Sequence, residues 1–327
     1  MNEKREKMKN ILITSAGRRV SLVQEFKKTA LDFSEDIKVF TTDMEPRMAP
    51  ACHVSDGYFP VSSATSDNYI SELLEICKSN GIGIVIPTID TCLPVLSSNK
   101  HLFEENGIHV IVSSQDFVSI CCDKRKTFEY FKELGIRCPK AIDINKPIFP
   151  IFAKPFGGSS SKGVHTILRE EDLSESIKND PNLMFMEYID KHEYKEFTVD
   201  MYYGRDNHVK CIVPRERFEI RGGEVSKAIT RKNYLVDYLK ERFENLPGVV
   251  GCICVQLFCR ERDNDVVGIE INPRFGGGYP LSFHAGANFP RMIMQEYFQD
   301  KTLEYREDWR DNLMMLRYDA EVIAEPD

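Results

Sequence analysis

Short apolar runs alternate with amphipathic stretches through the first third of the chain. Four runs have the length and β-branched content of buried strands: "NILITSAG", "IKVFTTD", "IGIVIPTID" and "IHVIVSS". The intervening stretches "VSLVQEFKKTA", "DNYISELLEICKSNG" and "LPVLSSNKHLFEENG" are predicted to be helices. This alternation predicts a doubly wound parallel sheet of the Rossmann type.

The pattern changes after residue 114. "SSQDFVSICCDKRKTFEYFKELGI" is predicted to be one helix that contains Lys124. Period-two and β-branched runs then dominate, with turn residues between them, which predicts an α+β region with antiparallel pairing. We therefore expect two domains, residues 1–114 and 115–327, with a small flap subdomain at about residues 148–187.

Composition limits the class of protein. The 42% apolar and 29% charged residues are typical of a soluble globular protein, and the net charge of −8 disfavours a nucleic-acid partner. No apolar run approaches the ~20 residues that span a bilayer, and no signal-peptide pattern is present. The ten cysteines include no C-x-x-C pair. We expect reduced, mostly buried thiols in a cytoplasmic protein without a membrane partner.

The segment "AKPFGGSSSKGV" places Lys154 just before a run of glycine and serine. Such a run frees backbone N–H groups, which together with an ammonium group favour phosphate. It is not a Walker A loop, because Val164 and His165 follow Gly163 where Lys and Ser/Thr are required. Its flanks predict strand, loop and strand. An ordinary mobile hairpin remains the alternative.

The segment "IEINPRFGGG" carries the strongest local signal. Strand alternation places Glu270, Asn272 and Arg274 on one face, and a loop at residues 261–265 would bring Gln256 opposite Glu270. Their oxygens are hard ligands that suit Mg²⁺, and Arg274 would contact a transferring phosphoryl group. A solvated hairpin face is the alternative for any one of these residues.

Ligands of doubly wound sheets lie beyond the carboxyl ends of the strands. Residues 15–19, Asp43 and residues 88–90 occupy such positions, and capping of strand ends is an equally supported role for Asp43, Thr88 and Asp90. The absence of G-x-G-x-x-G from the first turn disfavours a nicotinamide-dependent dehydrogenase.

The short strand around "MEYI" could bind a purine, with backbone groups hydrogen-bonded to its edge and apolar side chains against its faces. Met186, Tyr188 and Ile189 have suitable types, and Glu196 could accept from ribose hydroxyls, although core packing is the simpler role for the apolar residues.

Taken in order, these elements resemble the ATP-grasp ligase superfamily. The resemblance runs through "DKRKTFEYFKELGI", "AKP" with its flap, "MEYI", "EFTVD", "VQLF" and "IEINPRFGGG". It is nearest to the branch of the carbamoyl phosphate synthetase large subunit and the pyrrolysine-biosynthesis carboxylate–amine ligase. The resemblance implies a pre-ATP-grasp domain, followed by a two-subdomain ATP-grasp fold that binds the nucleotide between antiparallel sheets.

The resemblance also implies residue roles. Lys154 and Arg274 would be catalytic, and Gln256, Glu270 and Asn272 would hold one or two Mg²⁺, with Mn²⁺ as the alternative ion. The implied ATP-binding residues are Lys124, Lys154, Gly157, Gly158, Ser159, Ser160, Ser161, Gly163, Glu187, Tyr188, Ile189 and Glu196.

Several implied roles leave alternatives open. Glu193 is an alternative to Glu196 as the ribose ligand. The insertion "EYKEF" lengthens the usually short segment between "EYI" and the glutamate that binds ribose. The segment "RERFEIRGGEVS" resembles a substrate-side loop. Candidate substrate-binding residues are Asp90, Thr88, Arg215 and Arg217, the two arginines as carboxylate clamps.

The activity that the resemblance implies is an ADP-forming carboxylate–amine ligation through an acyl phosphate. Its partners would be a small carboxylate or amino acid and an amine, and "NFPRMIMQEYFQD" allows either a core helix or a homodimer contact. Carbamoyl-phosphate-synthetase-like phosphorylation of bicarbonate or carbamate is one alternative, although this chain has the length of one half of that enzyme's large subunit. A non-catalytic nucleotide-binding protein is the other alternative.

Overall fold

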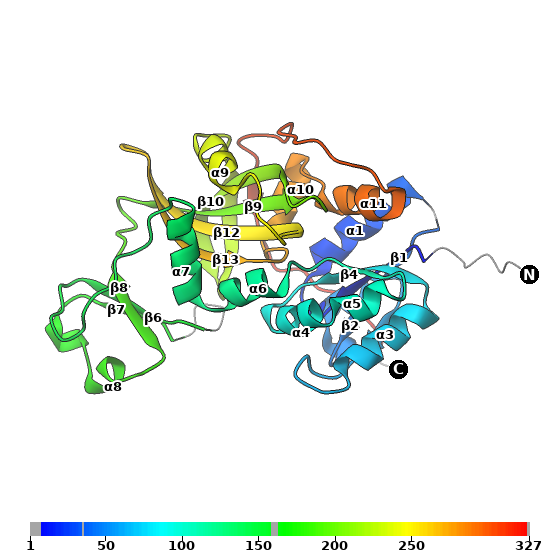
Figure 1. Cartoon of the computed structure of the whole chain (residues 1–327), viewed down its shortest axis with the longest axis horizontal. Coiled ribbons are helices and arrows are strands. Elements are labelled where there is room, and N and C mark those ends of the chain that lie inside the picture. The colour runs from blue at the N-terminus through cyan, green and yellow to red at the C-terminus, as the bar shows by residue number, and fades with distance from the viewer. Residues whose placement is uncertain (1–7, 35, 158–162, 326–327) are drawn as a thin grey trace, which may run out of the picture.

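Three β-sheets organise the part of the chain that the computed structural model describes, residues 8–34, 36–157 and 163–325. Figure 1 shows a small sheet at one end, a large antiparallel sheet in the middle and a parallel sheet at the other end. The parallel and antiparallel sheets confirm the predicted fold class.

The first sheet is parallel, in the order β3-β2-β1-β4-β5. Its strands are β1 (Asn10–Thr14), β2 (Val39–Asp43), β3 (Tyr58–Pro60), β4 (Ile82–Pro87) and β5 (His109–Val110). The helices between them are α1 (Val20–Phe33), α2 (Pro50–His53), α3 (Tyr69–Ser79), α4 (Leu93–Ser98) and α5 (Lys100–Glu104). Every residue of β4 is buried, as a central parallel strand covered on both faces requires.

The second sheet is antiparallel, in the order β13-β12-β9-β10-β11-β14. Its strands are β9 (Lys195–Tyr203), β10 (Val209–Arg221), β11 (Glu224–Thr230), β12 (Gly251–Arg260), β13 (Asp265–Asn272) and β14 (Met314–Leu316). Helix α9 (Leu235–Phe243) packs on β10, and α7 (Lys124–Glu133) packs on β13. A Cβ at Gly268 would lie 2.7 Å from the Phe131 ring, so a glycine at this position allows the close approach of α7.

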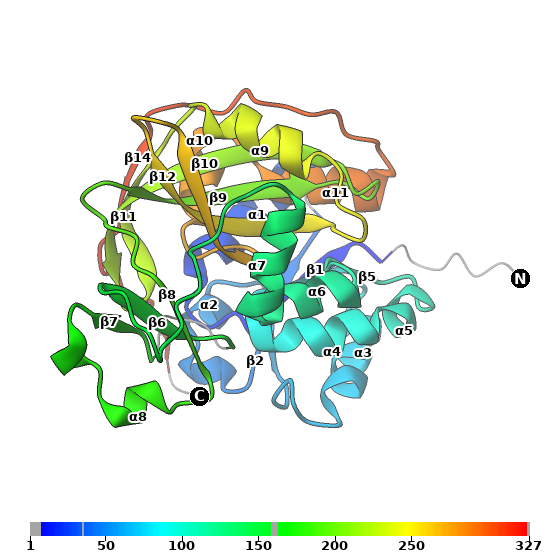
Figure 2. The same ribbon diagram turned by 60° about the vertical axis from the view of Figure 1, so that its left-hand side comes forward.

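The third sheet is small, in the order β7-β6-β8, and has its own apolar cluster around Ile151, Ala153 and Ile167. It consists of β6 (Ile151–Pro155), β7 (His165–Ile167) and β8 (Leu183–Glu187), with α8 (Glu175–Lys178) beside it. Figure 2 shows this sheet on one side of α7, with the large sheet above it.

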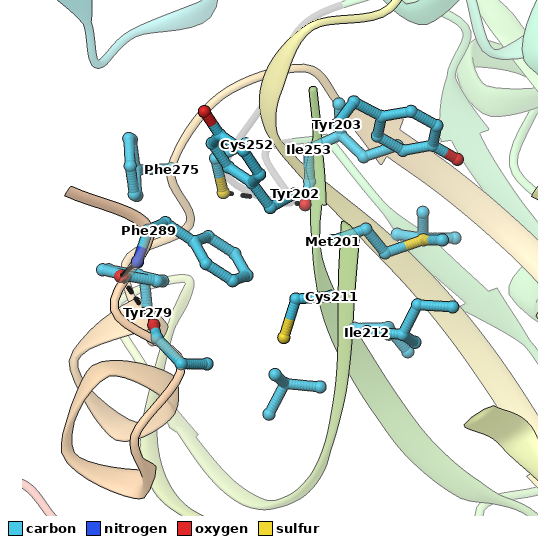
Figure 3. Close-up of a cluster of buried hydrophobic side chains, with 14 of the residues drawn as sticks. Met201, Tyr202, Tyr203, Cys211, Ile212, Cys252, Ile253, Phe275, Tyr279 and Phe289 are labelled. Atoms are coloured by element: carbon cyan, nitrogen blue, oxygen red, sulfur yellow. Dashed lines mark hydrogen bonds between the residues drawn. The ribbon is translucent and has the colours of Figure 1, made fainter. Parts of the chain in front are cut away.

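Helices α10 (Tyr279–Ala285) and α11 (Phe289–Gln299) join the first domain to the large sheet, because both pack on α1. Figure 3 shows the cluster in which Tyr279 and Phe289 lie beside residues of β9, β10 and β12. The Tyr279 hydroxyl accepts a hydrogen bond from the Phe289 backbone N–H at 2.8 Å. The segment "NFPRMIMQEYFQD" therefore supplies core residues, Phe289 and Met292 among them.

The single helix predicted over "SSQDFVSICCDKRKTFEYFKELGI" is wrong. It is two helices, α6 (Gln115–Cys122) and α7, which break at Asp123. The Asp123 carboxylate accepts a hydrogen bond from the Arg125 backbone N–H at 2.9 Å and thereby caps α7. Lys124 is consequently the first residue of α7 rather than an interior one.

The parallel sheet ends at Val110, and the boundary between residues 114 and 115 stays a prediction.

All ten cysteines are free and eight are buried, which agrees with the expected thiols. Among the described helices, none has both the length and the apolar composition needed to span a bilayer.

Candidate functional site

The β12–β13 hairpin holds the oxygen donors predicted from the sequence. Gln256 pairs with Glu270 as predicted, and Cys254 pairs with Asn272. The predicted loop at residues 261–265 is wrong, because Asp265 already pairs with Arg260, and a register shift between Gln256 and Leu257 brings Gln256 opposite Glu270. The Asn272 side-chain amide donates a hydrogen bond to Glu270 Oε1 at 3.0 Å. One carboxylate and two amides therefore lie at neighbouring positions of the β12–β13 hairpin. Together they form a hard, weakly charged oxygen set.

Lys154 reaches this hairpin from the small sheet. Its side chain is only 6% exposed, and Nζ lies 3.5 Å from the Ile269 carbonyl oxygen and 5.3 Å from the centre of the Phe128 ring. Burial lowers the pKa of Lys154 to about 8, while Glu270 raises it and Lys124 lowers it further. The structure therefore gathers both lysines and Glu270 at one place.

Lys124 and the flap lie next to each other. The Lys124 backbone N–H donates to the Phe156 carbonyl at 2.9 Å, which fixes the start of α7 against the end of β6. Gly157 and Gly163 stand at the two ends of the flap. The predicted phosphate ligands Gly158, Ser159, Ser160 and Ser161 lie outside the described residues.

Arg274 forms a bidentate ion pair with Asp90 of the first domain. Nε and Nη2 donate to the two carboxylate oxygens, each at 2.8 Å. Nη2 also donates to Asn272 Oδ1 at 3.2 Å, and Nη1 donates to the Phe275 carbonyl at 3.2 Å. A guanidinium has five N–H groups, so these described partners leave one, on Nη1. Sequence reasoning found both residues but missed that they bind each other.

Arg215 differs from the clamp predicted for it. Its side chain is 1% exposed and forms a bidentate pair with Asp200, at 2.7 and 3.0 Å. Asp200 also accepts from the Ser282 hydroxyl at 2.6 Å. This buried pair lies within the large sheet, so the Arg215 guanidinium is not open to a substrate. The predicted loop "RERFEIRGGEVS" is likewise a hairpin of β10 and β11.

Two further predicted ligands bind each other. Arg217 Nη1 lies 2.6 Å from Glu196 Oε1, so the second proposed clamp and the proposed ribose ligand form an ion pair. The rival Glu193 pairs with Arg260 and Arg262, at 3.1 and 3.3 Å. Glu196 is the less exposed of the two glutamates, with 17% of its side chain accessible against 44% for Glu193.

Thr88 is tied into the first domain. Its buried hydroxyl lies 2.9 Å from the Thr14 carbonyl and 2.8 Å from the Ser15 carbonyl, which joins the ends of β4 and β1. This geometry matches the strand-end role rather than substrate binding. Asp43 is similar, because it accepts from the Gly17 N–H at 3.0 Å.

Residues 187–189 connect the small sheet to the large one. Glu187 accepts from Arg137 Nη1 at 2.9 Å and from the Lys140 N–H at 3.1 Å. Ile189 is buried, whereas Tyr188 is half-buried. Arg137 also pairs with Asp265 of β13 at 3.0 Å, which fixes this connection, and sequence reasoning missed that arginine.

Two family models match the chain. The model described as "PylC-like, N-terminal domain" matches residues 11–111. The model described as "ATP-grasp in the biosynthetic pathway with Ter operon" matches residues 179–319. Residues 11–111 therefore match a PylC-like N-terminal domain, and residues 179–319 match an ATP-grasp domain.

The curated relatives that match this chain are ligases by name. A 3-methyl-D-ornithine–L-lysine ligase from Methanosarcina acetivorans is 30% identical over 172 residues, which cover 51% of this chain and 42% of the relative. The matches span less than half the length of the curated relatives.

Solved structures share the fold. An N5-carboxyaminoimidazole synthetase from Staphylococcus aureus, complexed with ADP, has a TM-score of 0.70 at 16% identity and covers 95% of this chain and 93% of its own. The biotin carboxylase domain of a Hydrogenobacter thermophilus 2-oxoglutarate carboxylase, a dimer with MgADP, ADP and bicarbonate, has a TM-score of 0.68 at 16% identity. It covers 94% of this chain and 73% of its own.

Proposed function

We propose that this ATP-grasp chain is an ATP-dependent carboxylate–amine ligase. The observation that carries the proposal is the contact of Lys154 with β13. There a buried ammonium group, the Glu270–Asn272 pair and Arg274 lie along one strand end. Cations beside hard oxygen ligands form an environment for a metal-bound polyphosphate.

The first half-reaction is phosphoryl transfer. A substrate carboxylate oxygen attacks the γ-phosphorus of ATP, the bond from that phosphorus to the β–γ bridging oxygen breaks, and ADP leaves. Lys154 and Lys124 hold the phosphates, and Arg274 offers its remaining Nη1 N–H to the transferring group. Asp90 holds the Arg274 side chain in place for that contact. The chain contributes mainly position and charge.

In the second half-reaction an amine, present as its neutral form, attacks the acyl carbon. The bond from that carbon to the phosphate oxygen breaks, phosphate leaves, and the nitrogen loses one proton to give the amide. We assign no side chain to that proton.

The metal-binding residues fit Mg²⁺. Gln256, Glu270 and Asn272 supply one carboxylate and two amide oxygens, and no group of three His, Cys, Asp or Glu residues among the described residues offers a rival site. When bound, the ion neutralises phosphate charge. Asn272 would turn its amide so that the oxygen faces the ion, giving up its bond to Glu270 and the one that it accepts from Arg274.

Isotope transfer tests the ligase proposal. The enzyme is incubated with ATP, Mg²⁺, hydroxylamine as a general amine, and a panel of carboxylates labelled with ¹⁸O. We expect ADP, a hydroxamate and one ¹⁸O atom in the released phosphate. Release of AMP, or phosphate without label, would contradict an acyl phosphate. ADP release that needs only bicarbonate would favour the bicarbonate-phosphorylating alternative.

A further inference from the structure

A pocket of about 230 Å³ lies between the first domain and the β10–β11 hairpin and is rich in arginine. Arg18 of the first domain lines one side, the β10–β11 turn with Gly222 and Gly223 lines another, and Arg317 completes it. Three segments that are distant in the sequence therefore build one cationic wall.

The pocket carries more positive than negative charge. Glu224 pairs with Arg317 at 2.8 Å, and Arg221 pairs with Asp319. Burial raises the pKa of Glu224, but Arg19, Arg317 and Arg18 together hold it below its usual value. Arg18 and Arg19 are the surplus charges, because neither guanidinium donates a hydrogen bond to another described residue.

Arg19 lies between this pocket and the reaction centre. A Cβ at Gly277 would lie 3.1 Å from Arg19 Nη1 and 2.9 Å from Glu224 Oε1, so Gly277 leaves room for both groups. Burial lowers the pKa of the half-buried Arg19, and its neighbour Arg274 lowers it further. Glu224 and Asp90 offset part of this effect, but the pKa of Arg19 stays below its ordinary value, so a further anion beside the Arg19 guanidinium would stabilise its charge.

We propose that the carboxylate substrate carries a second anionic group, which Arg18 of this pocket and the adjacent Arg19 bind. The inference rests on the proposed ligase function, since it directs the reacting carboxylate toward Arg274 and the second anion toward the pocket. A carboxylate and a phosphate or phosphonate share this chemistry, because both accept paired N–H groups from a guanidinium.

Equilibrium binding tests the pocket separately from catalysis. Calorimetric titrations with ADP and Mg²⁺ present would compare glutarate with its monoamide glutaramate, which has the same length and one anionic group fewer. A third probe, 3-phosphonopropionate, separates a phosphonate preference from a carboxylate preference. The variants are Arg18→Ala and Arg19→Gln, with the exposed Arg310→Ala as the matched control.

We expect the wild type and Arg310→Ala to bind glutarate or 3-phosphonopropionate at least about tenfold more tightly than glutaramate. We expect that ratio to fall toward one in Arg18→Ala and Arg19→Gln. Equal binding of the three probes to the wild type, no binding of any, or an unchanged ratio in both variants would overturn the inference. Tight, arginine-dependent binding without hydroxamate from any carboxylate would instead contradict the ligase proposal and leave the pocket standing.

Discussion

Arg274, two residues after β13, and Asp90, three residues after β4, form a bidentate ion pair that joins the large sheet to the first domain. The pair fixes four atoms of the guanidinium plane. It therefore determines where the remaining Nη1 N–H points. Under the proposed function, the first domain would position Arg274 through this contact.

Asp90→Asn tests the positioning role. We expect kcat to fall by about 10²-fold while the KM for ATP changes little, because the amide no longer holds Arg274 by charge at the point of phosphoryl transfer. Steady-state kinetics measure the split between kcat and KM, with the exposed Asp116→Asn as the control. A rise in KM alone, or a loss of folding by circular dichroism, would assign Asp90 another role.

We expect Lys154 to make nucleotide binding depend on pH. Its pKa of about 8 in the free protein lies below the ordinary value, because burial disfavours the charged form. Bound phosphates favour the ammonium and raise that pKa, so binding takes up a proton above pH 8. We expect ADP affinity to be full below pH 8 and to fall by about tenfold per pH unit above it.

Calorimetry in buffers with different ionisation enthalpies would measure that proton uptake. Lys154→Arg keeps the charge, so its ADP affinity should change little between pH 7 and pH 9 (both about two or more units below a guanidinium pKa). Lys154→Met should bind weakly at every pH. A wild-type affinity that stays constant across this range would show that Lys154 does not contact the phosphates.

Glu270→Gln tests the metal-binding residues. The substitution removes the only carboxylate of the Gln256–Glu270–Asn272 set while preserving its shape. We expect the Mg²⁺ concentration for half-maximal activity to rise by roughly 10-fold to 100-fold. Metal titrations at fixed ATP check this. The exposed Glu261→Gln on the same hairpin is the control, and an equal Mg²⁺ requirement in both variants would contradict the assignment.

Glu25 of α1 makes stability depend on pH. Both carboxylate oxygens are buried without a described partner, and burial, followed by Asp200, raises the pKa well above its usual value. The folded state therefore holds this proton more tightly than the unfolded state. The stabilisation is complete below the unfolded pKa of about 4.3 and is lost as pH rises toward the folded pKa.

Glu25→Gln removes the loss of folding stability that accompanies deprotonation of Glu25. We expect its Tm at pH 7 to exceed that of the wild type by about 2 °C or more, with the difference vanishing near pH 4. Thermal unfolding across this range measures the effect, and the exposed Glu105→Gln should follow the wild type. A destabilised Glu25→Gln at pH 7 would mean that the carboxylate is ionised and bound.

The parts of the site that follow from strand geometry were predictable. Alternation along β13 places Glu270 and Asn272 on one face, whereas the pairing of Gln256 with Glu270 also needs a register shift next to Gln256 that the sequence did not indicate. The alternation depends on neighbours in sequence. The break at Asp123 also has a local signal, since an aspartate before "KRKTF" can cap a helix, but continuous apolar spacing favoured one helix.

The ion pairs between distant segments were not predictable in this way. Arg274 contacts Asp90 across 184 positions, and Arg137 contacts Asp265 across 128. Arginine and carboxylate types indicate that such pairs can form, but not which ones. The choice depends on how the three sheets pack, which no local pattern encodes. The sequence "TSAGRR" does not show that its arginines lie near Glu224 and Gly277, which only the structure reveals.

A crystal structure with ADP and Mg²⁺ tests the central claim most directly. The account predicts the diphosphate within hydrogen-bond distance of Lys154 Nζ, with the ion bound by Glu270 and Asn272. A nucleotide that binds away from the β12–β13 hairpin, with Lys154 still facing only the Ile269 carbonyl, would contradict it.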